Sequence, residues 1–79
     1  MFKSLEQKIY DSPTLSIKDY FDSAFKKFDL GDLKGAIGDY SKVIERDEKN
    51  VSAYYNRGVA RQNLGNNAGA IADFARVIE

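Results

Sequence analysis

Carboxylates and amines supply most of the chemistry available to this sequence, because it contains no histidine and no cysteine. Two neighbouring carboxylates can act as the general acid and the general base of an enzyme. The acidic pairs of this chain, given below, instead fall in predicted turns and on solvated helix faces. Without histidine or cysteine the chain lacks the usual zinc ligands and a side chain that titrates near neutral pH. The acidic pairs are Asp19/Asp22, Asp29/Asp32 and Asp47/Glu48.

The glycines at 31, 35 and 38 do not form a phosphate-binding loop. Such a loop follows a strand and ends in Gly-Lys-Ser/Thr, and neither feature is present here. Gly31 is better explained as a turn, and Gly35 and Gly38 as part of a helix start. We therefore expect a non-enzymatic protein with no metal site and no cofactor.

The length and the net charge of the chain narrow the possible classes of function further. The chain has 79 residues, which limits it to one small domain, and its 12 basic and 12 acidic residues give a formal net charge of zero. Nucleic acid therefore has no overall electrostatic attraction to it. No apolar run is long enough to span a bilayer, and Glu6, Gln7 and Lys8 interrupt the place where a signal peptide is apolar. We expect a cytoplasmic protein with no nucleic-acid or membrane partner.

An internal repeat organises most of the sequence. The stretch GAIGDYSKVIE at 35–45 recurs as GAIADFARVIE at 69–79, a shift of 34 residues. Aligning 17–45 with 51–79 needs no gap and gives ten identities. The identical pairs are 20/54, 30/64, 31/65, 35/69, 36/70, 37/71, 39/73, 43/77, 44/78 and 45/79.

Each copy of the repeat predicts two helices. Ser16, followed three residues later by Asp19, is typical of a capping box at the start of the first helix. Leu30-Gly31-Asp32 breaks that helix, and a second one is predicted from about Leu33 until the polar run 46–50. Asn50 is expected to cap the next helix, and Gly65-Asn66-Asn67 to form the matching turn.

Small residues occupy matching positions in the two copies, Ala24 with Gly58 and Ala36 with Ala70. Glycine inside a helix costs about 1 kcal/mol relative to alanine. We therefore expect close packing of the paired helices at these positions, because a bulky side chain there would hold them apart.

This pattern resembles the tetratricopeptide repeat, a 34-residue helix-turn-helix unit. The resemblance implies an all-α fold, with antiparallel helix-turn-helix pairs stacked as a short right-handed α-solenoid. It implies one unit at 17–50 and a second at 51–79, incomplete at its C-terminal end, after an N-terminal segment at 1–16. The matching residues are Tyr20, Ala24, Gly31, Ala36, Tyr40 and Val43 in the first copy, and Tyr54, Gly58, Gly65, Ala70, Phe74 and Val77 in the second.

The chain departs from the family pattern at a few positions. Glu48 replaces the proline that often ends a repeat, and Arg46 stands where an aliphatic residue is usual. Lys27 and Arg61 replace a later aromatic of the first helix, and we expect their stems to cover apolar surface while their charges reach water.

The family resemblance also implies a function, the binding of a protein or peptide partner on the concave face lined by the first helices. Chaperone-binding members grip a C-terminal carboxylate with a lysine and an asparagine, but Phe21 and Phe25 stand at those two places here. Asn56 matches only the asparagine of the second repeat, so recognition of acidic tails is not expected. The concave-face positions are Lys18, Phe21, Phe25, Phe28, Ser52, Tyr55, Asn56, Val59 and Gln62.

Two occupants suit the apolar strip of Phe21, Phe25 and Phe28. One is the apolar face of a partner helix or an extended apolar peptide. The other is the chain itself, since Phe2, Leu5 and Ile9 share one side of a short helix predicted within residues 1–10.

An alternative function is self-association as an assembly module. The second copy stops at Glu79 without the polar-faced helix that usually seals such an array, so we expect either a fragment of a longer array or something else that covers its end. A homodimer through the last helix is one such cover. The predicted contact residues are Ile71, Phe74, Val77 and Ile78.

Overall fold

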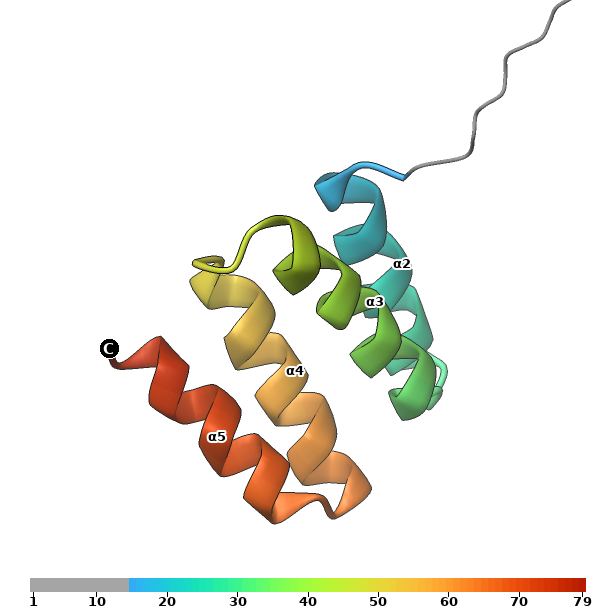
Figure 1. Cartoon of the computed structure of the whole chain (residues 1–79). Coiled ribbons are helices and arrows are strands. Elements are labelled where there is room, and N and C mark those ends of the chain that lie inside the picture. The colour runs from blue at the N-terminus through green and yellow to red at the C-terminus, as the bar shows by residue number, and fades with distance from the viewer. Residues whose placement is uncertain (1–14) are drawn as a thin grey trace, which may run out of the picture.

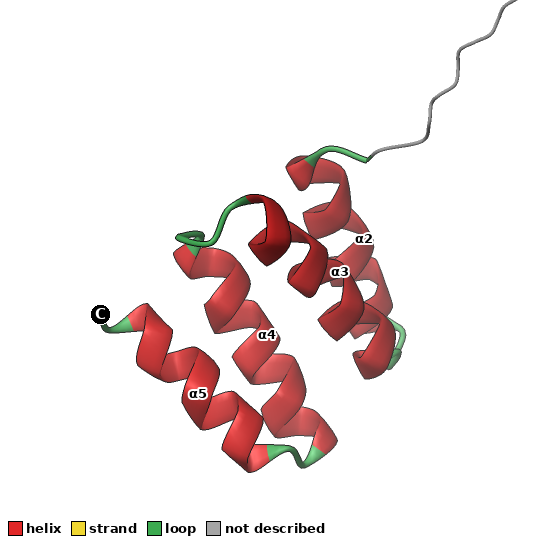
Figure 2. Cartoon of the chain, viewed as in Figure 1, coloured by secondary structure: helices red, strands yellow, loops and turns green. Residues whose placement is uncertain are grey.

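Four α-helices make up the part of the protein that the computed structural model describes, residues 15–79. They are α2 (Ile17–Asp29), α3 (Leu33–Arg46), α4 (Val51–Leu64) and α5 (Asn67–Val77). Each helix packs against the next one along the chain, so the four lie side by side in chain order (Figure 1). Only short loops join them, and residues 15–79 contain no strand (Figure 2). The predicted all-α fold of helix-turn-helix pairs is confirmed, and the short helix predicted around Phe2, Leu5 and Ile9 lies outside the described residues.

The helices begin and end at the residues that the sequence indicated. Ser16 and Asp19 form the predicted capping box, in which each side chain accepts a hydrogen bond from the backbone N–H of the other, at 3.1 and 3.2 Å. Asn50 caps α4 as predicted by accepting from the N–H of Ala53 at 3.0 Å. Gly31 and Gly65 make the turns with φ of 84° and 92°, in the left-handed region that glycine adopts without steric cost.

Small residues bring the paired helices into close contact, as expected. In the first unit Ala24 of α2 and Ala36 of α3 are fully buried and pack with Tyr40. In the second unit a Cβ atom added to Gly58 would lie 2.6 Å from the ring of Phe74, closer than any normal contact. Gly58 is therefore required by the packing of α4 against α5.

The first prediction compares two glycines inside helices. Gly58→Ala should lower the free energy of unfolding by about 1–3 kcal/mol, because the new methyl group overlaps the Phe74 ring. Gly38→Ala should raise it by about 0.5–1 kcal/mol, because nothing lies within 4 Å of its added Cβ and alanine favours the helix. Urea denaturation followed by circular dichroism measures both. A stabilising Gly58→Ala would contradict the close contact.

A buried ion-pair network joins three of the helices. Asp73 of α5 is only 2% exposed. Arg57 of α4 donates to both of its carboxylate oxygens, at 3.0 and 2.8 Å, and Arg61 donates to one of them at 3.0 Å. Arg57 also donates to the Ser41 hydroxyl of α3 at 3.1 Å. A single guanidinium group therefore links the last helix of the first unit to both helices of the second.

The first unit has a weaker version of the same network. Asp39, the equivalent of Asp73, accepts a hydrogen bond from Ser23 at 2.6 Å and pairs with Lys27 at 3.1 Å. We expected the charges of Lys27 and Arg61 to reach water. The Lys27 side chain is 40% exposed and pairs with Asp39, whereas the Arg61 charge lies against the buried Asp73 between α4 and α5. The sequence showed the identity of the two aspartates but assigned them no role.

The second prediction compares these two carboxylates. Asp73→Asn should cost about 3 kcal/mol of stability, because it leaves Arg57 and Arg61 without their buried counter-charge. Asp39→Asn should cost about 1 kcal/mol or less, because its partner Lys27 is 40% exposed and can turn to water. The measurement is urea denaturation of both variants in parallel. Equal losses would show that Asp73 does not hold the units together.

Candidate functional site

One apolar groove lies between the first helices of the two units. Its volume is about 180 Å³, and none of the residues that line it is charged. Its polar groups are the Asn56 amide and two tyrosine hydroxyls. The lining residues are Phe25, Phe28, Tyr40, Tyr55, Asn56 and Val59.

Two helices supply the walls of this groove. Phe25 and Phe28 are three residues apart on α2, and Tyr55 and Val59 are four apart on α4, so each pair faces the same side of its helix. Phe25 and Tyr55 are each 53% exposed. Each wall therefore carries one half-exposed aromatic ring.

Tyr40 of α3 contributes from beneath the walls and is 1% exposed. The rings of Phe21 and Phe25 meet it edge-on, with centroids 5.9 and 6.4 Å away. Burial raises the pKa of the Tyr40 phenol, with smaller contributions from the charges of Asp29 and Asp39, so it stays neutral at physiological pH. The sequence placed Tyr40 in the core, and only the arrangement of α2 and α4 around it shows that its ring also reaches the groove.

The ion-pair network behind α4 fixes which side of that helix faces the groove. Arg57 and Arg61 are turned toward Asp73 and Ser41. Their neighbours Asn56 and Val59 line the groove. Tyr55 also packs on Phe74 of α5, with ring centroids 5.9 Å apart. The second unit therefore holds its wall of the groove through contacts made on the other side of α4.

Five of the nine predicted concave-face residues line the groove, namely Phe25, Phe28, Tyr55, Asn56 and Val59. The other four do not. Lys18 is exposed and pairs with Asp22 at 2.8 Å, and Ser52 and Gln62 are exposed on α4. Phe21 packs against the core formed by Ala24, Ala36 and Tyr40.

The predicted aromatic strip on α2 is therefore divided. Phe21 and Phe28 are both half-buried against the protein's own core, whereas Phe25 is the most exposed of the three. Phe28 and Phe25 still reach the groove, and Phe21 supports them from behind through Tyr40. The core interpretation of the stripe therefore holds for Phe21 and Phe28, whereas Phe25 stays exposed beside the groove.

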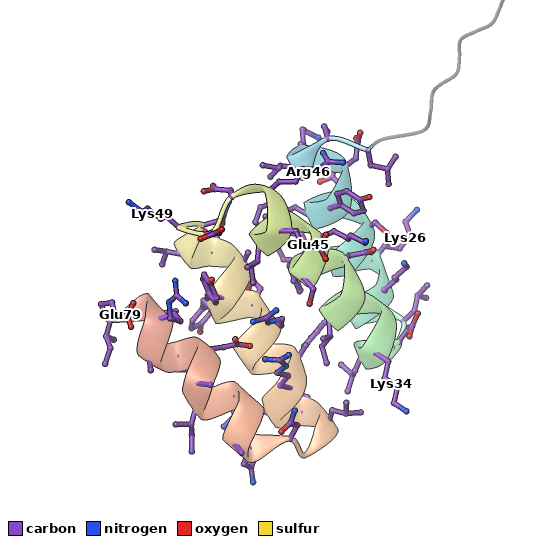
Figure 3. All side chains as sticks on the ribbon, in the orientation of Figure 1. Lys26, Lys34, Glu45, Arg46, Lys49 and Glu79 are labelled. Atoms are coloured by element: carbon purple, nitrogen blue, oxygen red, sulfur yellow. The ribbon has the colours of Figure 1, made fainter. Side chains whose placement is uncertain are left out.

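A second hollow of about 330 Å³ lies between the α3–α4 loop and the end of α5. In Figure 3 Lys49 and Glu79 lie on its side of the molecule. Arg76 lies over the Tyr54 ring, 4.8 Å from its centroid, much as Arg46 lies over Tyr20 at 5.3 Å. Exposed side chains of both charges surround this hollow, so its shape depends on flexible groups. The residues that line it are Glu48, Lys49, Val51, Tyr54, Arg76, Val77 and Glu79.

The groove offers apolar walls and one amide group. Its walls can cover apolar side chains, and the Asn56 amide can donate and accept hydrogen bonds. In residues 15–79 no cluster of three or more acidic residues is placed to hold a metal ion. No helix of that same part is long and apolar enough to cross a membrane.

Comparison with known proteins gives one match. The family model described as TPR repeat matches residues 26–65, which are 40 of the 79 residues and reach from α2 to the end of α4. No curated protein and no solved structure matches the chain. The matched region contains the junction between the two units and every groove-lining residue except Phe25. The 34-residue repeat, the paired helices and this match show that the chain belongs to the tetratricopeptide repeat family.

Proposed function

We propose that this protein is a non-catalytic interaction module that binds the apolar side of a partner helix, or an extended apolar peptide, in the groove between α2 and α4. The observation that carries the proposal is a groove with no charged lining residue, flanked by two half-exposed aromatic rings. Protein–protein interaction is the general role of the family. The chemistry of the partner comes from the residues of this chain.

Covering the groove supplies a moderate driving force. Burying a whole aromatic side chain is worth about 1.5–3 kcal/mol, so covering the exposed halves of Phe25 and Tyr55 contributes about 1 kcal/mol each. Val59 and Phe28 add less, because they are already half-buried. A micromolar dissociation constant corresponds to a binding free energy of about −8 kcal/mol. Reaching that value requires further contacts along α2 and α4. We therefore propose a transient complex rather than a permanent one.

An acidic peptide does not suit this groove. Lys18 pairs with Asp22 outside it, and Arg57 and Arg61 are paired with Asp73. No cation therefore lines the groove to meet a carboxylate, and moving an unpaired carboxylate out of water is costly. The family's grip on C-terminal carboxylates is not part of the proposed function.

The third prediction tests the groove with a defined probe. The probe is a fluorescein-labelled peptide of leucine, alanine and lysine, with leucines at i, i+3, i+4 and i+7, beside a scrambled peptide of the same composition. Val59→Glu should weaken binding of the patterned peptide about tenfold or more, because it places a charge in the groove. Gly38→Glu adds the same charge to α3 in open space and should leave binding unchanged. Fluorescence anisotropy measures all four combinations.

Three outcomes would overturn the proposed site: equal affinities of the two variants, equal binding of the scrambled peptide, or tighter binding of an acidic peptide ending in a free carboxylate. Removing residues 1–12 tests whether the groove is open to partners or is covered by the N-terminal segment of the chain itself. A clear gain in affinity on truncation would assign residues 1–12 as an internal occupant, and unchanged affinity would leave the groove to partners.

A further inference from the structure

The outer face of α5 is an uncharged surface that the proposed function does not use. Its five residues are apolar and exposed, with Ile71 69% and Ile78 86% exposed. They recur at helical spacing, so they share one side of the helix. We call this surface the α5 face. Its residues are Ala68, Ile71, Ala72, Ala75 and Ile78.

The charged side chains of this region are paired elsewhere. Asp73 is buried against Arg57 and Arg61. Arg76 lies over Tyr54 and pairs with Glu79 at 3.2 Å, beyond the last turn of the helix. A surface helix normally turns charged residues to water, and an exposed contiguous apolar face commonly marks an interaction surface.

Phe74, one of the predicted contact residues, does not lie on the outer face of α5. Its ring packs against Gly58 and Tyr55 of α4. Val77 is half-buried and lines the hollow beside Tyr54. Of the four contact residues predicted from sequence, Ile71 and Ile78 belong to the α5 face, and Ala68, Ala72 and Ala75 complete it.

The first unit shows that this fold packs a helix against the surface of α3 that is equivalent to the α5 face. Ile37, Ser41 and Ile44 of α3 stand 34 residues before Ile71, Ala75 and Ile78. All three are half-buried and share one side of α3, the side on which Ser41 accepts a hydrogen bond from Arg57 of α4. The equivalent stripe on α5 is exposed within residues 15–79 and has the same residue spacing as this helix-docking surface.

The outer face of α2 from a second copy does not fit this surface. Ala53 and Ala60 of α4 are both fully buried and lie in line with Arg57, on the side that meets α3. Their equivalents on α2 are Asp19 and Lys26, both exposed, and Lys26 projects outward from α2 in Figure 3. Head-to-tail stacking would bury both charges without partners, which is costly.

The α5 face itself does fit. We infer that two copies of this chain pair through their α5 faces, with the two helices antiparallel and the two-fold axis level with residue 73. In that register Ile71 opposes Ala75 of the second copy, and Ile78 opposes Ala68 of the second copy. Each large side chain therefore meets a small one, and no charge opposes a like charge. The antiparallel arrangement also places the N-terminus of each α5, where the helix dipole is positive, beside the negative C-terminus of the other copy.

This pairing is a closed, isologous contact, because the same surface serves both copies. Two helices of this length meet over about 16 Å, which places the interface at the small end of stable dimers. We therefore expect a reversible monomer–dimer equilibrium. The groove between α2 and α4 is not part of the contact, so the failure of peptide binding and the failure of pairing are separate results.

The fourth prediction tests the pairing by sedimentation equilibrium of the full chain over a wide concentration range. The average mass should rise from 8.9 kDa toward twice that value. Ile71→Glu and Ile78→Glu should each raise the dissociation constant at least tenfold, because a carboxylate would be buried at the contact. Leu30→Glu alters a residue that is 78% exposed beside α2 and should behave as the unmodified chain. A constant monomer mass, or dissociation caused by Leu30→Glu, would overturn the inference.

Single cysteines test the orientation, since the chain contains none of its own. In the proposed register the two copies of Ala72 are offset by about 3 Å along the axis, within reach of a disulfide once the helices are close-packed. The two copies of Ala68 are offset by about 15 Å, beyond that reach. Mild oxidation should therefore cross-link Ala72→Cys and leave Ala68→Cys monomeric on a denaturing gel. Equal cross-linking of both variants would overturn the antiparallel register.

Discussion

The buried carboxylate of Asp73 is the constraint on which the arrangement of the two units depends. It has almost no contact with water, so it must be paired within the protein, and Arg57 and Arg61 of α4 provide that pairing. Because Arg57 also binds Ser41 of α3, the same network sets how the second unit sits on the first. A buried ion pair adds little net stability, but it strongly disfavours any packing that would separate its members.

Fixing the rotation of α4 decides what each side of the molecule presents. With Arg57 and Arg61 turned inward, Asn56 and Val59 face α2 across the groove. Both units place a cation beside the equivalent aspartate, so these charged groups are paired between the helices and not at the groove. The groove itself is lined by uncharged residues, and under the proposed function this favours apolar partners over acidic ones.

The outer face of α2 and the outer face of α5 differ in charge. α2 carries Asp19 and Lys26 where α4 has buried alanines, so its outer face is suited to water. The outer face of α5 keeps the isoleucines of the repeat and adds alanines. A pair formed through α5 would leave both grooves free, and two linked grooves bind a two-site partner more tightly than one groove can.

The sequence by itself determined the helices, their ends, the pairing of helices into units and the family, because each of these depends on local signals. Caps such as Ser16 and Asn50 act within one turn, the glycine turns depend on one backbone angle, and the 34-residue repeat is visible without coordinates. The positions that needed small residues were also readable, since Ala24 and Gly58 recur in register.

Only the tertiary structure decided which residues of the predicted face reach the groove and where the charges go. Helical spacing gives the side of a helix but not its rotation against neighbours, so it could not tell that Phe21 packs inward while Phe25 stays exposed. It could not place Phe74 beneath α4, or bring Tyr40 from α3 to the groove. The ion pairs of Asp39 and Asp73 join residues at least twelve positions apart on different helices, and packing alone brings such residues within hydrogen-bonding distance.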